Sequence, residues 1–170
     1  MCVFAKVIAR FVEVVGQVPG LLKADVKSAF SRIPIDPEHR WACGVAFKVF
    51  DQIYISMHAS CPFGAVASVH AWERVGAAIT HIVKKFLKIA LLRYVDDLFG
   101  PERCDSRRRS CTVSVLVFCV FVYVRKETMQ HALECVARLI RVLLGPTAVA
   151  EDKLACGMKL DVLGVSTCAF

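Results

Sequence analysis

Three aspartates stand where they could bind a divalent cation. Asp25 ends the mostly apolar run 20–24, and Asp96 and Asp97 follow a second apolar run that begins at Leu91. Each run is typical of a buried strand, and the adjacent carboxylates are typical of a tight turn. Asp also suits turns for structural reasons alone, because it tolerates turn geometry and bonds its own backbone. Two strand ends that bring carboxylates together would nevertheless offer the oxygen ligands that Mg²⁺ prefers.

The order of apolar and polar segments predicts how these strands are held. After a strand over 21–26, the chain has a hairpin over 41–49 and 52–56, and then a long amphipathic helix over 65–90. A second helix is predicted over 127–144 and ends at Gly145-Pro146. A closing strand is expected over 159–166, with Gly164 at a bend. The pattern indicates an α+β fold with an antiparallel sheet and two helices packed on one face.

The composition fits one globular domain. The 170 residues are 56% hydrophobic and 22% charged, which excludes a disordered chain. The formal charge of +7 would suit a polyanionic partner, but the segment 103–126 holds six basic residues and one acid. The rest of the chain therefore carries only +2, and the charge is weak evidence for nucleic-acid binding over the whole surface.

The cysteines and the apolar segments exclude several classes. Nine cysteines are scattered without CxxC spacing, so we expect reduced thiols and an intracellular protein, in nucleus or cytoplasm. The apolar run 112–124 would span roughly 20 Å as a helix, too short for a ~30 Å bilayer core. Residues 1–15 are interpreted as a strand or helix fragment and not as a signal peptide. The sequence therefore predicts no membrane partner.

The combination of motifs resembles the palm domain of reverse transcriptases, closest to the retroelement type of eukaryotic genomes. The matching pieces are DVKSAF at 25–30, PFG at 62–64 before a long helix, YVDD at 94–97, Lys153, and LGV at 163–165. A YxDD alone is a weak motif, but DxxxAF seventy-one residues earlier makes the combination specific. The resemblance implies an RNA-directed DNA polymerase palm that extends from about residue 21 to residue 165.

The resemblance implies a two-metal active site. Asp25 and Asp96, with the Val26 carbonyl, would hold two Mg²⁺ ions about 3.5–4 Å apart, with Mn²⁺ as a possible substitute. Asp97 matches the second aspartate of the motif and would support the site. Lys153 matches a lysine that can donate a proton to pyrophosphate, although a merely solvated loop lysine fits the sequence equally well. We expect folding to bring position 25 against positions 96 and 97.

The resemblance also implies contacts with nucleotide and primer. Phe30 matches the aromatic residue that excludes a ribose 2′-hydroxyl, although by pattern alone it is a core residue after a strand. The backbone of Ala29 would face the triphosphate, and Tyr94 would lie near the primer end. Phe63 and Gly64 match the PFG loop, which would lie under the templating base pair. Leu163 and Gly164 match the hairpin that would grip the primer strand.

Three departures from the family pattern define the expected segments. Residues 1–20 are a fragment of the fingers or unrelated, 21–103 are the palm core, 104–126 are an insertion, and 127–170 complete the palm. The fingers are therefore expected to be partial and the thumb absent. The insertion holds a triple arginine and an apolar block, and translated non-coding sequence would explain it. Without fingers and thumb, a duplex would lose many of the phosphate contacts that hold it.

Two functions from different classes follow. The first is reverse transcription: transfer of dNTPs onto a primer 3′-hydroxyl, with an RNA or DNA template and Mg²⁺. The alternative is an inactive, truncated retroelement remnant, at most a weak nucleic-acid or protein-binding module. An unrelated α+β enzyme with a carboxylate metal site is a third reading. The sequence does not distinguish the template preference or the oligomeric state.

Overall fold

The computed structural model describes residues 3–16, 18–103 and 129–168, so the predicted insertion at 104–126 lies outside the described residues. The chain divides into two compact units, one built from 1–27 and 76–170 and the other from 28–75. The segment 28–75, which the sequence pattern assigned to one palm core with its neighbours, forms its own unit because its contacts are mostly internal.

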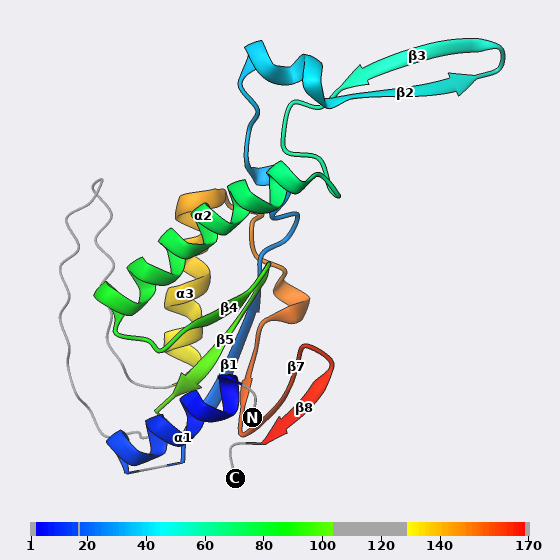
Figure 1. Ribbon diagram of the computed structural model, residues 1–170. Helices are drawn as coiled ribbons and strands as arrows, with labels where there is room; N and C mark the ends of the chain where they lie inside the picture. Colours follow the sequence, from blue (N-terminus) through cyan, green and yellow to red (C-terminus); the bar gives the residue numbers. More distant parts are fainter. Residues whose placement is uncertain (1–2, 17, 104–128, 169–170) are drawn as a thin grey trace. The chain divides into compact units, whose positions relative to one another are not determined.

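A four-stranded antiparallel sheet forms the centre of the first unit (Figure 1). Its spatial order is β4 (Leu92–Tyr94), β5 (Asp97–Glu102), β1 (Gly20–Asp25) and β6 (Ala155–Gly157). The strand β1 pairs with β5 on one side and with β6 on the other. Leu21, Leu22 and Ala24 are fully buried, because both faces of β1 are covered.

Helix α3 (Met129–Leu144) covers one face of this sheet. It contacts β1 and β6, and its inner side is buried from Ala132 to Ile140 at helical spacing. Gly20 lies on the same face, where an added Cβ would collide with the sulfur of Met129. Side chains alternate along a strand, so Leu22 and Ala24 of β1 also point to this face. The Gly145 backbone, with a φ of +102°, ends the helix as the sequence predicts.

The opposite face carries helix α1 (Val3–Val15) and the hairpin of β7 (Lys159–Val162) and β8 (Val165–Cys168). Phe4 of α1, Leu21 of β1, Phe99 of β5 and Val162 of β7 form one buried cluster. The Phe4 and Phe99 rings meet edge to face with centroids 5.0 Å apart. The predicted single strand over 159–166 is thus a hairpin, because the chain reverses at 163–164 and does not merely bend.

Helix α2 (Val66–Ile82) is shorter than the predicted helix over 65–90. It continues as a π-helical turn, η3 (Val83–Leu87), and Lys88 then adopts a left-handed backbone with a φ of +56°. The apolar periodicity continues beyond the helix because Ile89 is buried in the segment leading to β4. Periodicity alone could not reveal this end, since the same residues are apolar in either structure.

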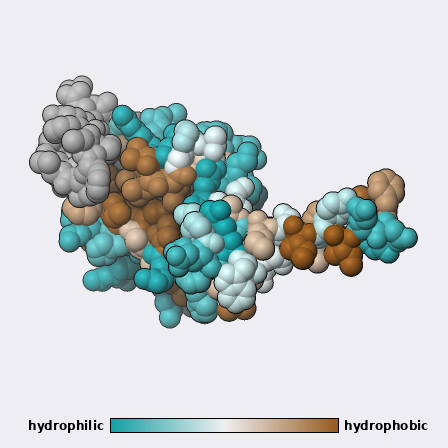
Figure 2. Space-filling model, turned by 90° about the horizontal axis from the view of Figure 1, so that it is seen from above, coloured by the Kyte–Doolittle hydropathy of each residue, from teal (hydrophilic) through white to brown (hydrophobic). Residues whose placement is uncertain are grey.

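The second unit contains the hairpin of β2 (Gly44–Val49) and β3 (Gln52–Met57), preceded by the 3-10 helices η1 (Phe30–Arg32) and η2 (Pro37–Cys43). The Asp36 side chain caps η2 by accepting a hydrogen bond from the Glu38 amide. Every residue of the two strands is exposed, and Figure 2 shows several of their hydrophobic side chains uncovered. Phe47 and Tyr54 stack across the hairpin with centroids 5.9 Å apart.

The structure confirms the α+β class with antiparallel sheets. Residues 3–15, which could have been strand or helix, form α1 and pack on the sheet. In the described part of the chain, each helix is too short or too polar to cross a membrane. Four cysteines, Cys43, Cys61, Cys135 and Cys156, are free thiols.

We expect Gly100→Ala to destabilise the protein by about 3 kcal/mol, the cost of overpacking against a rigid neighbour. A Cβ at Gly100 would overlap the backbone carbonyl of Ala90, which cannot move aside as a side chain could. The matched control is Gly157→Ala in β6, where the nearest atom would lie at an ordinary 3.6 Å. Urea unfolding measures both; equal free energies of unfolding for the two variants would contradict this packing.

Candidate functional site

The three predicted aspartates meet at one end of the central sheet. In the β1–β5 register Asp25 stands directly opposite Asp97, and side chains so paired have Cβ atoms about 5 Å apart. The next amide along the chain, that of Val26, donates to the Asp96 carbonyl at 3.1 Å. The Asp25 carbonyl in turn accepts from the Ala150 amide at 3.1 Å. Backbone hydrogen bonds therefore hold this end of β1 on both sides.

The turn between β4 and β5 consists of Val95 and Asp96, so Asp97 is already the first residue of β5. The sequence pattern had placed both aspartates in the turn. The difference arises because a two-residue hairpin loop needs positive φ at its first central position. Val95 supplies it with a φ of +52°, a strained conformation for a β-branched residue. The Arg93 guanidinium donates to the Val95 carbonyl at 3.3 Å and supports the turn.

Two lysines bind the carboxylates. Lys153, at the end of the 3-10 helix η4 (Glu151–Lys153), places its Nζ 2.8 Å from Oδ2 of Asp25. Asp25 is only 4% exposed, so this pairing compensates a carboxylate that would otherwise be costly to bury. Lys23 of β1 lies with its Nζ 3.8 Å from Oδ1 of Asp97.

Sequence reasoning missed the Lys23 contact, although a signal for it exists. Lys23 precedes Asp25 by two residues on a strand, so both side chains point to the same face of the sheet. On that face Lys23 also donates to the main-chain carbonyl of Asp161 in β7, at 3.2 Å. One lysine thus joins the carboxylate end of β5 to the separate β7–β8 hairpin.

The balance of charge and burial changes two pKa values. Burial raises the pKa of Asp97 above its usual range; Lys23 opposes this, while Asp25 and Asp96 add to it by repulsion. The hydrogen bond to Asp25, together with that group's negative charge, raises the pKa of Lys153. At neutral pH Lys153 is therefore firmly protonated, and Asp97 binds a proton more readily than a free aspartate does.

The donor set suits a hard cation such as Mg²⁺ in its chemistry, since Asp25, Asp96, Asp97 and the Val26 carbonyl offer only oxygen. Two of the carboxylates face ammonium groups in this structure. Within the described ranges, no three His, Cys, Asp or Glu side chains are arranged as a metal site. A bound cation would thus have to compete with Lys153 for Asp25.

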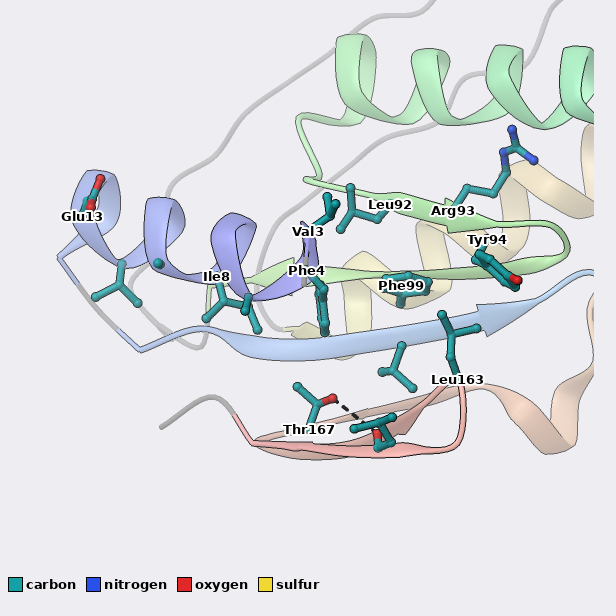
Figure 3. A pocket seen from close by; sticks show the side chains of 15 residues that line it. Val3, Phe4, Ile8, Glu13, Leu92, Arg93, Tyr94, Phe99, Leu163 and Thr167 are labelled. Atoms are coloured by element: carbon teal, nitrogen blue, oxygen red, sulfur yellow. Dashed lines mark hydrogen bonds between the residues drawn. The ribbon is translucent and has the colours of Figure 1, made fainter. Parts of the chain in front are cut away.

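Tyr94 and Leu163 line a groove beside this edge. The groove, of about 1030 Å³, lies between α1, the sheet and the β7–β8 hairpin and is lined mainly by apolar side chains (Figure 3). Tyr94 is 61% exposed next to the aspartate turn. Leu163 and Gly164 form the hairpin turn, and both have positive φ, as a type I′ turn requires.

The remaining predicted residues lie in the second unit. The rings of Phe30 and Phe63 meet edge to face with centroids 5.6 Å apart, so the motif position and the PFG loop do come together. Ala29 is buried at the start of η1, whereas Phe63 is 90% exposed. Gly64 has a φ of +88° and an open surrounding, so its backbone is accessible.

Comparisons with known proteins identify the fold. No family model and no curated protein sequence matches the chain, whereas 82 chains of solved structures do. One is the foamy viral protease-reverse transcriptase in complex with an RNA/DNA hybrid, with a TM-score of 0.56 and 17% sequence identity. The alignment covers 89% of this chain and 16% of that one. The chain therefore has a reverse-transcriptase-like fold and spans a small part of the viral protein.

We expect Asp97→Asn to stabilise the metal-free protein at pH 7. The raised pKa of Asp97 means that its ionised form costs folding free energy above the folded-state pKa, and that this cost disappears as pH falls below the unfolded value near 4. The urea midpoint of the variant should exceed that of the wild type at pH 7, and the two should converge toward pH 3.5. The exposed Asp152→Asn is the control; a lower midpoint for Asp97→Asn at pH 7 would contradict this account.

Proposed function

We propose that this chain is the palm region of an RNA-directed DNA polymerase, which transfers dNTPs onto a primer 3′-hydroxyl. The observation that carries the proposal is the β1–β5 register, which sets Asp25 opposite Asp97 within a reverse-transcriptase-like fold. The strained Val95 turn adds support, because backbone strain of this kind concentrates at functional sites.

Asp25 and Asp96, with the Val26 carbonyl, are the residues proposed to hold Mg²⁺. Two such ions would lower the pKa of the attacking hydroxyl and stabilise the leaving pyrophosphate. Lys153 is proposed to act on the leaving group. Lys153 holds its proton at neutral pH on the carboxylate edge, where it could protonate or neutralise a departing phosphate.

The proposal also assigns substrate contacts to individual residues. Leu163 and Gly164 would contact the primer strand, with Tyr94 near the primer end. Ala29 and Phe30 would contact the incoming nucleotide, and Phe63 and Gly64 would lie under the templating base. A nucleic-acid partner is consistent with the viral reverse transcriptase, whose structure was solved with an RNA/DNA hybrid.

We expect Asp96→Asn to abolish primer extension, lowering the rate at least about a thousandfold, because the loss of one carboxylate removes a metal ligand of the reacting centre. The assay is incorporation of labelled dNTP on a primed RNA template with Mg²⁺ or Mn²⁺. Asp152→Asn, a nearby exposed carboxylate, is the matched control and should retain activity.

Metal binding is measured separately from catalysis, so that an inactive protein with an intact metal site can be distinguished from one without a metal site. Mg²⁺ should raise the melting temperature of the wild type and of Asp152→Asn, but not of Asp96→Asn or Asp25→Asn. A melting shift without incorporation would support a metal-binding but inactive remnant. Neither a shift nor incorporation, with Mg²⁺ or Mn²⁺, would overturn the polymerase proposal.

We expect Phe30→Ala to raise ribonucleotide use relative to deoxynucleotides by at least about tenfold, because a smaller side chain leaves room for the 2′-hydroxyl. The ratio of kcat/KM values for matched rNTP and dNTP substrates measures this effect. Phe50→Ala removes a ring that is 97% exposed in the hairpin turn and should leave the ratio unchanged. An unaltered ratio in Phe30→Ala would remove this residue from the nucleotide site.

A further inference from the structure

We propose that Lys23 is a positioning residue that ties the β7–β8 hairpin to the Asp97 carboxylate and thereby sets where a primer strand lies against the catalytic edge. The inference rests on the proposed function, because it is that function that gives the hairpin a primer to hold. The tether itself is a property of the structure and can be tested without any activity.

Apart from its chain connection to β6, which ends at Gly157, the hairpin is held on the main sheet by side-chain contacts. β7 and β8 form a two-stranded sheet that is separate from the four-stranded one in the described part of the chain. Its apolar packing on the main sheet is made by Val162, which is buried against Phe4, Leu21 and Phe99, and by the partly buried Leu160. Such packing is non-directional, so it defines the orientation of the hairpin less sharply than a hydrogen bond would. A directional contact adds that definition.

Lys23 provides that contact from a rigid base. Its backbone lies at the middle of β1, paired with Phe99 of β5 on one side and with Ala155 of β6 on the other. Its ammonium donates to the Asp161 carbonyl at 3.2 Å, next to the buried Val162. The same nitrogen lies 3.8 Å from the Asp97 carboxylate. A charged donor makes the hydrogen bond to the carbonyl stronger than a neutral one.

The ion pair of Lys23 and Asp97 is less exposed to solvent than an ordinary surface ion pair. The side chains of Lys23 and Asp97 are 21% and 23% exposed, whereas the surface pair of Arg10 and Glu13 is 75% and 64% exposed. Partial burial weakens solvent screening and fixes the long lysine side chain. The hydrogen bond from Lys23 to the Asp161 carbonyl joins the sheet to the hairpin across 138 residues of sequence.

The tether predicts a specific functional signature. Loosening the hairpin should weaken the hold on the primer strand and leave the nucleotide contacts of the other unit unchanged. For Lys23→Met we expect the KM for primer-template to rise about five- to tenfold, within the range of one net intramolecular hydrogen bond, with the KM for dNTP unchanged. Loss of the Asp97 contact should lower kcat as well. Lys23→Arg should restore most of the primer-template KM, because its guanidinium can reach both acceptors.

Hydrogen exchange of the metal-free protein tests the tether directly. In Lys23→Met the amides of 159–168 should exchange about five- to tenfold faster, while those of α3 keep their wild-type protection. Lys159→Met, which removes an exposed lysine from the hairpin itself, is the matched control and should leave exchange unchanged. Lys23→Gln, which keeps a polar side chain, replaces the methionine variant if that one does not fold.

The outcomes distinguish this inference from the proposed function. Unchanged hairpin exchange in Lys23→Met, or in Lys23→Gln, overturns the tether whatever the enzyme does. Faster exchange in the hairpin and in α3 alike also overturns it, because that result indicates global destabilisation. The wild type could also incorporate no nucleotide while the hairpin of Lys23→Met exchanges faster than that of the wild type. That result supports the tether and rejects only the polymerase proposal. A raised KM for dNTP with an unchanged KM for primer-template overturns the positioning role.

Discussion

The antiparallel register between β1 and β5 is the constraint on which the site depends. It pairs Asp25 with Asp97, and a shift by one residue would turn one of the two carboxylates toward the α3 face of the sheet. The register is secured by burial on both faces, because Leu22 and Ala24 must meet α3 while Leu21 must meet Phe4. The apolar core therefore fixes the geometry of the polar edge.

That edge gathers more negative charge than a buried surface tolerates, and the chain balances it with lysines from two directions. Lys153 arrives from the loop after α3, and Lys23 arrives from β1 itself. Burial, and to a smaller extent repulsion by Asp25 and Asp96, still raises the pKa of Asp97 against the opposing charge of Lys23. The ionised edge therefore costs folding free energy, as charged functional sites often do.

Each of the two hairpins beside the groove has a strained turn. Val95 in the β4–β5 turn and Leu163 in the β7–β8 turn both have positive φ without being glycine. Each such residue costs on the order of 1–3 kcal/mol, which the paired strands must supply. Both turns belong to hairpins whose residues line the groove of Figure 3. The two tight hairpins thus place Tyr94 and Leu163 at the groove.

The sequence by itself determined which segments form most of the strands and helices, and it named the candidate site residues. Alternation and helical spacing are local, so β1, the β2–β3 hairpin and α3 were predicted within a few residues. The DVKSAF and YVDD motifs likewise indicated a reverse-transcriptase-like fold through their resemblance to that family. Their site roles follow from the resemblance and stay predictions.

Only the tertiary structure decided how these parts meet. It placed α1 on the sheet, ended α2 before Ile89, and turned the predicted closing strand into a hairpin, because apolar patterns record burial and not what covers it. It also joined Lys153 to Asp25 across 128 residues and Lys23 to the backbone of Asp161 across 138. A contact with a main-chain carbonyl leaves no trace in residue types, so no pattern in the sequence could have predicted it.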